Sequence, residues 1–261
     1  MQYLVFFLAF IFGTIIGSFL NVVALRFRTG KSVGGRSLCF SCGKTLRFYE
    51  LVPLLSFVFQ RGKCRGCRSS ISIQYPLVEL LTGVAFGLLA LYSTTLFWFL
   101  LHAAAFSILM VIAVYDIRHK IIPDSLSFAF GVLGFVAMLA LNWNNLFSFE
   151  GLLALLAGPL LFLPFFILWL ISGGVWMGLG DAKLSVGIGW LLGLASGISA
   201  LIIGVWAGAL WSVVAMATRR GRKLTFKSEI PLAPFLIFGT FLSLLIHPDI
   251  FSLNLWLSFL N

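Results

Sequence analysis

Two aspartates stand at the ends of long apolar runs, where a carboxylate is costly to keep. Asp116 closes one run, and Asp181 completes a Gly-Leu-Gly-Asp motif at residues 178–181. The chain has only eight acidic residues among 261. Two carboxylates close together in a poorly solvated site do not ionise together easily, so one can stay protonated while the other is charged. Such a pair could hydrolyse a peptide bond, the ionised aspartate taking a proton from water and the protonated one donating to the carbonyl oxygen.

Each aspartate also has a simpler structural interpretation. Asp181 could cap the helix that follows it, and Asp116 could pair with Arg118 or Lys120 at the membrane interface. Asp124 follows a proline and is predicted to be a helix N-cap. The three histidines, His102, His119 and His247, carry no clear signal, although His119 could be a proton carrier. The aspartates therefore need support from the rest of the sequence.

The four cysteines form two Cys-x-x-Cys pairs with 21 residues between them. They are Cys39, Cys42, Cys64 and Cys67. Two such pairs at this separation are typical of a four-thiolate zinc site, in which no ligand position stays open for catalysis. A glycine follows or lies within each pair (Gly43, Gly66) and helps to turn both sulfurs toward one metal. We therefore predict a structural zinc site; an iron–sulfur or redox role and unmetallated thiols are the alternatives.

The elements that must position these residues are membrane helices. Apolar residues make up 61% of the chain and charged residues 10%, against about a quarter charged in a soluble domain. The first run lacks a basic segment and a small-residue cleavage site, so a spanning helix is expected there rather than a signal peptide. Eight apolar spans are predicted: 3–25, 76–93, 96–115, 122–141, 151–171, 182–194, 197–217 and 231–247. The sixth is the shortest.

The positive charges orient these spans. All eighteen Lys and Arg residues fall in the loops 26–74, 116–121, 172–183 and 218–230, whereas the opposite side has only Glu150 and Asp249. The positive-inside rule then puts the N-terminus outside and both aspartates on the cytoplasmic side. The net charge of +10 is thereby explained by topology and by contact with membrane lipid, and nucleic-acid binding is not expected.

The ordered motifs resemble the type IV prepilin peptidases, membrane aspartyl proteases of the Gly-x-Gly-Asp kind. Besides the cysteine pairs, the matching segments in chain order are 17–23 (GSFLNVV), 49–53 (YELVP), 61–64 (RGKC), 73–81 (IQYPLVELL), 116–124 (DIRHKIIPD), 178–184 (GLGDAKL) and 230–235 (IPLAPF). Arg118, Lys120 and Ala182 depart from the usual pattern without removing either aspartate. The resemblance covers most of the chain.

The resemblance implies an all-α polytopic bundle of about eight transmembrane helices in the bacterial inner membrane. A first helix (1–25) would precede a cytoplasmic zinc-binding insert (26–75) and a peptidase domain (76–261). Such enzymes cut the basic leader from prepilins and pseudopilins, with Asp116 and Asp181 as the catalytic pair. Many also methylate the new N-terminus with S-adenosylmethionine. Glu50, Glu79 and Gly83 are candidate residues for that cofactor in the region 26–75 and just after it.

A basic leader would be repelled by the basic cytoplasmic surface, so its recognition is expected to depend on nearby acids. These acids are Glu50, Glu79, Asp116, Asp124 and Asp181. Four other interpretations stay open: a peptidase without methyltransferase activity, an intramembrane protease acting on other stems, a transporter with aspartates as a proton relay, and a membrane scaffold whose zinc module binds a partner.

Overall fold

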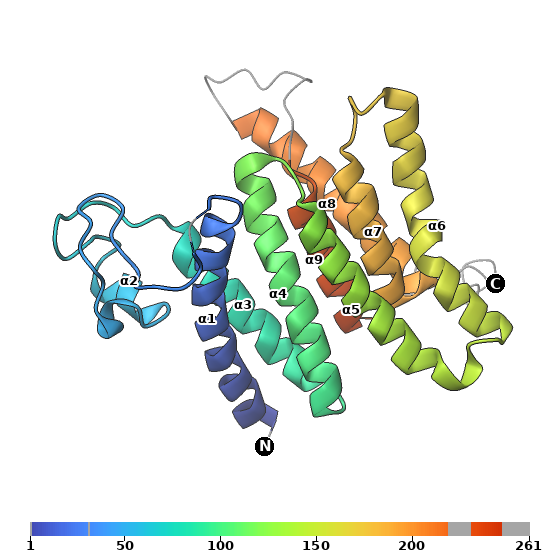
Figure 1. Cartoon of the computed structure of the whole chain (residues 1–261), viewed down its shortest axis with the longest axis horizontal. Coiled ribbons are helices and arrows are strands. Elements are labelled where there is room, and N and C mark those ends of the chain that lie inside the picture. Colours follow the sequence, from blue (N-terminus) through green and yellow to red (C-terminus); the bar gives the residue numbers. More distant parts are fainter. Residues whose placement is uncertain (1, 31, 219–230, 247–261) are drawn as a thin grey trace. The chain divides into compact units, whose positions relative to one another are not determined.

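The computed structural model describes residues 2–30, 32–218 and 231–246, and these are helical apart from loops and two isolated β-bridges (Figure 1). In chain order the elements are α1 (Gln2–Arg26), η1 (Phe48–Glu50), α2 (Leu55–Phe59), α3 (Gln74–Tyr92), α4 (Leu96–His119), α5 (Asp124–Asn142), η2 (Trp143–Asn145), α6 (Phe149–Ser172), α7 (Leu179–Leu192), α8 (Leu194–Thr218) and α9 (Ala233–Ile246). Outside the described residues lie several that the sequence analysis used: Ile230, His247, Asp249 and the basic residues Lys31, Arg219, Arg220, Arg222, Lys223 and Lys227.

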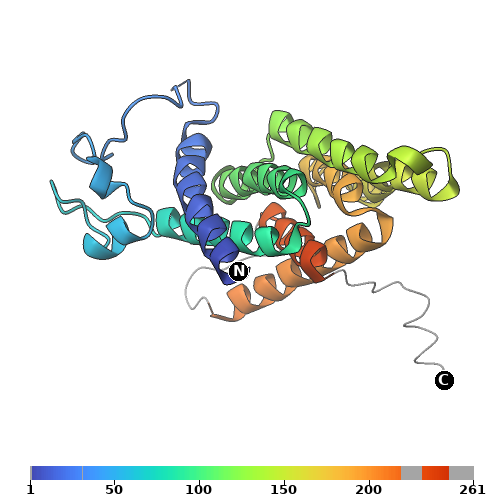
Figure 2. The same cartoon turned by 90° about the horizontal axis from the view of Figure 1, so that it is seen from below.

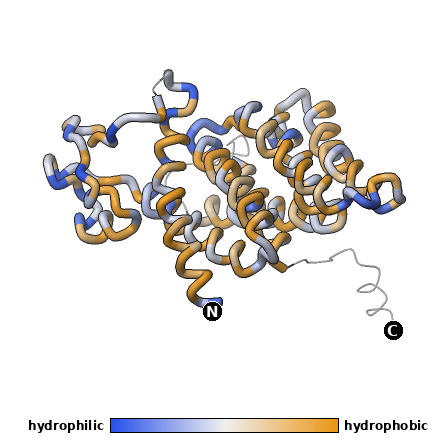
Figure 3. Tube along the Cα trace, turned by 60° about the horizontal axis from the view of Figure 1, so that its bottom comes forward, coloured by the Kyte–Doolittle hydropathy of each residue, from blue (hydrophilic) through white to orange (hydrophobic). Residues whose placement is uncertain are grey.

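Each predicted apolar span corresponds to one helix, and the all-α prediction is confirmed for the described residues. Within the described ranges, six helices are long and apolar enough to cross a membrane: α1, α3, α4, α5 with η2, α6 and α8. The helices α7 and α9 have 14 residues each. At about 1.5 Å per residue they extend about 21 Å, short of the ~30 Å hydrocarbon core. Eight full spans are therefore not confirmed. The helices are mostly hydrophobic along their length, and hydrophilic residues gather in the connections (Figure 3).

The chain divides into two compact units, of which the first is Met1–Val111. In this unit α1 and α3 lie side by side (Figure 2). A Cβ atom at Gly13 would lie 2.7 Å from the Cβ of Phe86, and one at Gly83 would lie 2.6 Å from Thr14 Cγ2. Small residues at such crossings let membrane helices approach closely. The cysteine-containing loop connects α1 to α3, so the packing of these two helices fixes both of its ends.

The second unit, Ile112–Asn261, contains α5 to α9. The short helix α7 contacts α5, α6, α8 and α9. Its contacts again run through glycine: a Cβ at Gly134 of α5 would lie 2.6 Å from the carbonyl oxygen of Gly187, and one at Gly189 would lie 2.5 Å from that of Ala157 on α6. Because backbone meets backbone at these points, α7 is held firmly, and with it Asp181 in its first turn.

Replacing Gly189 by valine is expected to destabilise the second unit, because no side chain fits at this crossing. Overpacking of this kind costs roughly 1–3 kcal/mol, which lowers the apparent melting temperature by about 3–10 °C. The measurement is thermal unfolding of the purified protein in detergent. The matched control is Gly131→Ala, also in a helix interior, where an added Cβ would meet nothing within 4 Å. An equal loss of stability in both variants would contradict the packing argument.

Candidate active site and metal site

Asp116 lies in the last turn of α4 and is 5% exposed. Its Oδ2 accepts a hydrogen bond of 3.2 Å from the backbone N–H of Ala233, the first residue of α9. The first N–H groups of a helix have no partner within it, so a carboxylate is a natural acceptor there. The helix α4 ends at His119. The next residue, Lys120, has a φ of +55°, and its N–H donates to the Asp116 carbonyl at 2.7 Å. Asp116 is thus oriented by a residue 117 positions away.

Asp181 is the third residue of α7 and is 8% exposed. A Cβ at Gly180 would lie 2.8 Å from the Cβ of Ile122, so glycine allows this turn to pack against the segment that follows α4. Gly178 precedes the helix with an ordinary φ of −75°, and the nearest atom to a Cβ there would be Asp181 Oδ2 at 3.8 Å. Close packing explains Gly180, whereas Gly178 leaves space beside the carboxylate.

The two aspartates, 65 residues apart in sequence, come together in the second unit. The first turn of α7, which carries Asp181, packs at Gly180 against Ile122, six residues beyond Asp116, and both carboxylates are buried. Burial and mutual repulsion are the two conditions under which paired carboxylates differ in protonation. This arrangement can therefore supply a general base and a general acid at one place.

The structure tests the simpler interpretation of Asp181 and the predicted cap at Asp124. The N-cap of α7 is Gly178 and makes no side-chain cap hydrogen bond, so Asp181 is not the cap. The prediction of Asp124 as an N-cap is wrong: the N-cap of α5 is Pro123, and Asp124 is the first helical residue. Its carboxylate instead accepts a 2.7 Å hydrogen bond from Lys183 Nζ. The N-cap residue is hard to assign from sequence when proline and aspartate are adjacent, because both residues also occur often in the first turn of a helix.

The four cysteine sulfurs lie within 4.8 Å of one another and could hold a metal ion. Cys39 Sγ and Cys67 Sγ are 3.9 Å apart. Four thiolates at about 2.3 Å around a tetrahedral zinc ion would be separated by about 3.8 Å. The donor set and its spacing therefore fit the predicted metal centre.

Both cysteine pairs have the same backbone structure. The N–H of Gly43 donates to the Cys39 carbonyl at 2.9 Å, and the N–H of Arg68 donates to the Cys64 carbonyl at the same distance. Gly43 and Arg68 both have positive φ, +69° and +58°. The residue equivalent to Gly43, which follows the first pair, is thus Arg68, and Gly66 lies inside the second pair. Gly66 instead donates its N–H to Cys64 Sγ at 3.4 Å.

The turn around Cys39 favours the thiolate that a metal requires. The backbone N–H groups of Cys42 and Ser41 lower the pKa of Cys39 to about 6. The Ser69 side chain and then its backbone N–H lower the pKa of Cys67 as well. Hydrogen bonds within the two cysteine turns thus favour the thiolate form of Cys39 and Cys67 even without a bound cation.

Glu50 fixes the first cysteine pair to η1. Its buried carboxylate accepts hydrogen bonds of 2.9 Å from the Arg47 N–H and from Lys44 Nζ, and Lys44 lies two residues after Cys42. The Arg47 N–H and then Lys44 lower the pKa of Glu50. A carboxylate with a lowered pKa stabilises the fold above its unfolded pKa, and this contribution is lost as pH falls through the folded value.

Replacing Glu50 by glutamine is therefore expected to destabilise the module 39–70 at neutral pH by about 2 kcal/mol, because Lys44 loses its charge partner. The difference from wild type should begin to shrink as pH falls below the unfolded pKa of about 4.3, and should be lost once pH has fallen through the lower pKa of the folded state. Hydrogen exchange of the module across pH measures both effects. A difference independent of pH would show that shape, and not charge, is what Glu50 contributes.

The other two cofactor candidates also have structural roles in the first unit. Glu79 Oε2 accepts a 2.8 Å hydrogen bond from the N–H of Leu54, a non-glycine residue with φ of +60°. Gly83 is covered by Thr14 and Phe10 of α1. These contacts join residues that are far apart in sequence, as the Asp116–Ala233 hydrogen bond does, and the role of Arg68 depends on backbone conformation. Neither kind of feature can be recognised from the sequence. The prolines at 231 and 234 are the one sequence signal that indicates a helix beginning near Ala233.

Known proteins match almost the whole chain. Residues 11–93 match the family model of the bacterial peptidase A24 N-terminal domain, and residues 103–213 match that of the type IV leader peptidase family. A protein of Bacillus subtilis (strain 168) named prepilin leader peptidase/N-methyltransferase is 36% identical, covering 93% of this chain and 95% of the relative. One of the same name from Neisseria gonorrhoeae is 31% identical over 88% and 89%.

A third relative, from Escherichia coli O78:H11 (strain H10407 / ETEC), is named type 4 prepilin-like proteins leader peptide-processing enzyme; it is 32% identical and covers 89% of this chain and 90% of itself. No solved structure matches significantly. Six apolar helices and these relatives indicate an inner membrane protein. The chain belongs to the type IV leader peptidase family.

Proposed function

We propose that this protein is an aspartic endopeptidase that removes the leader peptide from type IV prepilins and pseudopilins. The observation that carries the proposal is the pair of buried carboxylates, Asp116 and Asp181, in the unit that matches the leader peptidase family. The names of the relatives support the substrate class. A transporter or a scaffold would not require a pair of buried carboxylates, and the names of the relatives indicate neither of these functions.

In the proposed reaction one aspartate is ionised and takes a proton from water, while the other is protonated and donates to the carbonyl oxygen of the scissile bond. The N–H of Ala233 holds Asp116 by one carboxylate oxygen, which leaves the other for the reaction. When the intermediate collapses, the aspartate that took the proton from water gives it to the leaving amine. The other aspartate takes back a proton from a hydroxyl of the intermediate, which restores the starting state of the pair.

We further propose the topology given by the charge pattern. The N-terminus lies outside, the two aspartates lie on the cytoplasmic side, and α7 and α9 complete a set of eight helices as short or tilted segments. The distribution of lysine and arginine over the loops supports this orientation. A basic leader would then remain in the cytoplasm while its apolar stem stays in the bilayer.

The metal of the cysteine module is proposed to be structural zinc, with all four ligands from the protein. N-methylation of the new N-terminus with S-adenosylmethionine is proposed from the names of the relatives. The three candidate residues do not fit that cofactor well, because the carboxylates of Glu50 and Glu79 already accept hydrogen bonds and Gly83 is covered by α1. When bound, the cofactor would supply the methyl group; the described residues do not identify its ligands.

The test is co-expression with a prepilin that carries its leader, followed by mass spectrometry of the product's N-terminus. We expect a shortened and methylated N-terminus. Uncut precursor with the wild-type enzyme would overturn the proposed function. A cut but unmethylated product would restrict the function to the peptidase.

A further inference from the structure

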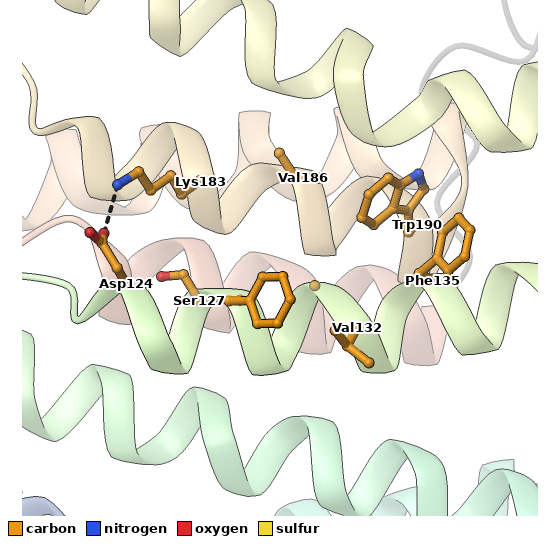
Figure 4. Close-up of a pocket in the computed structure, with 9 residues that line it drawn as sticks. Asp124, Ser127, Val132, Phe135, Lys183, Val186 and Trp190 are labelled. Carbon is orange, nitrogen blue, oxygen red and sulfur yellow. Dashed lines mark hydrogen bonds and ion pairs between the residues drawn. The ribbon is translucent and has the colours of Figure 1, made fainter.

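A groove of about 580 Å³ runs between α5 and α7 in the second unit (Figure 4). Its apolar walls are Phe128, Val132, Phe135, Val186 and Trp190. The residues of α7 that line it, at 183, 186 and 190, repeat at helical spacing on one face. Asp181 lies two residues before Lys183, about 200° around the helix. The groove is therefore a site separate from the catalytic pair.

One end of the groove is closed and rigid. The rings of Phe135 and Trp190 meet there at 5.0 Å between centroids, and Trp190 Nε1 donates to the Leu155 carbonyl of α6 at 3.0 Å. Between the two ends, Gly131 is buried, yet a Cβ on it would meet nothing within 4 Å. The absence of a side chain at Gly131 thus helps to keep the groove open.

The other end carries the only charged residues of the lining. Lys183 and Asp124 form an ion pair of 2.7 Å there, and both side chains remain accessible, at 38% and 68%. Figure 4 shows this pair at the end opposite Trp190 and Phe135. An occupant that complements the groove is therefore apolar along its length and has a cation and an anion side by side at one end.

The dimensions distinguish an acyl chain from a helix. The 11 residue steps from Asp124 to Phe135 rise about 16 Å, close to the ~15 Å of hydrocarbon in one leaflet. A helix with side chains is about 10 Å across, whereas α5 and α7 are in direct contact, with a Cβ at Gly134 lying only 2.6 Å from the carbonyl oxygen of Gly187. The groove suits one extended acyl chain better than the stem of a substrate.

We propose that the α5–α7 groove binds a zwitterionic phospholipid with a primary amine, of which phosphatidylethanolamine is the simplest example. One acyl chain lies along Gly131 toward Trp190. The phosphate accepts hydrogen bonds from Lys183, and the ammonium donates to Asp124, so each member of the ion pair exchanges its neighbour for a group of the same charge. An anionic lipid would leave Asp124 facing its negative headgroup.

Native mass spectrometry of the full-length protein in detergent tests this proposal, with phosphatidylethanolamine and phosphatidylglycerol added to delipidated protein. We expect one tightly held phosphatidylethanolamine per chain and weaker retention of phosphatidylglycerol. Gly131→Leu should abolish the retained lipid, whereas Gly131→Ala should keep most of it. Lys183→Gln should weaken phosphatidylethanolamine by about fivefold, and Asp124→Asn should remove the preference between the two lipids. Lys63→Gln, in the cysteine module, is the matched control and should change nothing.

Equal retention of both lipids by the wild type would overturn the proposed headgroup contact. Equal retention by Gly131→Leu and Gly131→Ala would overturn the proposed site. Displacement of the lipid by a synthetic prepilin stem peptide would assign the groove to the substrate instead. The two charge variants alter an exposed ion pair, so they test the proposal even if Gly131→Leu does not fold.

Discussion

Replacing either Asp116 or Asp181 by asparagine is expected to lower leader cleavage by about 10³-fold or more, because each supplies one half of the proton transfer. Asparagine has the same shape, and its carbonyl oxygen can still accept the Ala233 N–H. Loss of activity would therefore report on charge and proton exchange rather than on a changed fold. The measurement is the rate of leader removal from a purified prepilin in detergent micelles.

The double variant Asp116→Asn/Asp181→Asn should be no slower than the worse single variant, since residues that act as a unit are not additive. Glu150→Gln is the matched control: this exposed acid begins α6, and the charge pattern assigns it to the other side of the membrane. It should cleave at the wild-type rate. Full activity in either single aspartate variant would exclude the pair as the catalytic dyad.

Removing the metal is expected to unfold the cysteine module. Structural zinc sites contribute roughly 10–16 kcal/mol of apparent binding energy, more than the whole stability of a typical small domain. Most of the module's large apolar residues are exposed, including Phe40, Phe48, Val58 and Phe59. The side chains of Arg61 and Arg65 are already exposed. A strong chelator should therefore make the chain at these residues cleavable by trypsin by unfolding its backbone, while zinc is lost from the protein in proportion.

The matching variants are Cys64→Ser and Ser41→Ala. Cys64 is the most buried of the four cysteines, and its loss should reproduce the effect of the chelator. Ser41 lies between two ligands without being one, so its replacement should leave the zinc content at one per chain. A wild-type protein without zinc, or a module equally resistant to trypsin after chelation, would contradict the proposed role of the metal.

The helices were predictable because burial in lipid imposes a long apolar run, and lysine and arginine mark the connections. The exact bounds of the helices were less predictable. The helix that carries Asp181 begins at Leu179, before the predicted span of 182–194, because a Gly-Leu-Gly-Asp segment reads as a loop until its packing against Ile122 is known. Local composition therefore predicts that α7 exists but does not predict its first turn.

The site could be predicted only where chemistry leaves a pattern in adjacent residues. The cysteine pairs carry such a pattern, and their sulfurs do converge. The contact between Asp116 and Ala233 could not be predicted, since it joins a side chain to a backbone N–H in another helix. The positive φ of Arg68 could not be predicted for a different reason. The turn that both cysteine pairs share imposes this φ, and an arginine in the sequence does not indicate it.

The glycine crossings of the second unit have a consequence for how this protein tolerates mutation. At Gly134 and Gly189 the neighbouring backbones occupy the volume that any side chain would need, and at Gly187 the Phe130 ring occupies it. Large apolar residues such as Leu163, nearly half exposed on α6, can be exchanged for others of similar hydrophobicity. In a library of single substitutions, the positions with the smallest side chains should therefore be the least replaceable, and the bulky lipid-facing positions should be nearly interchangeable.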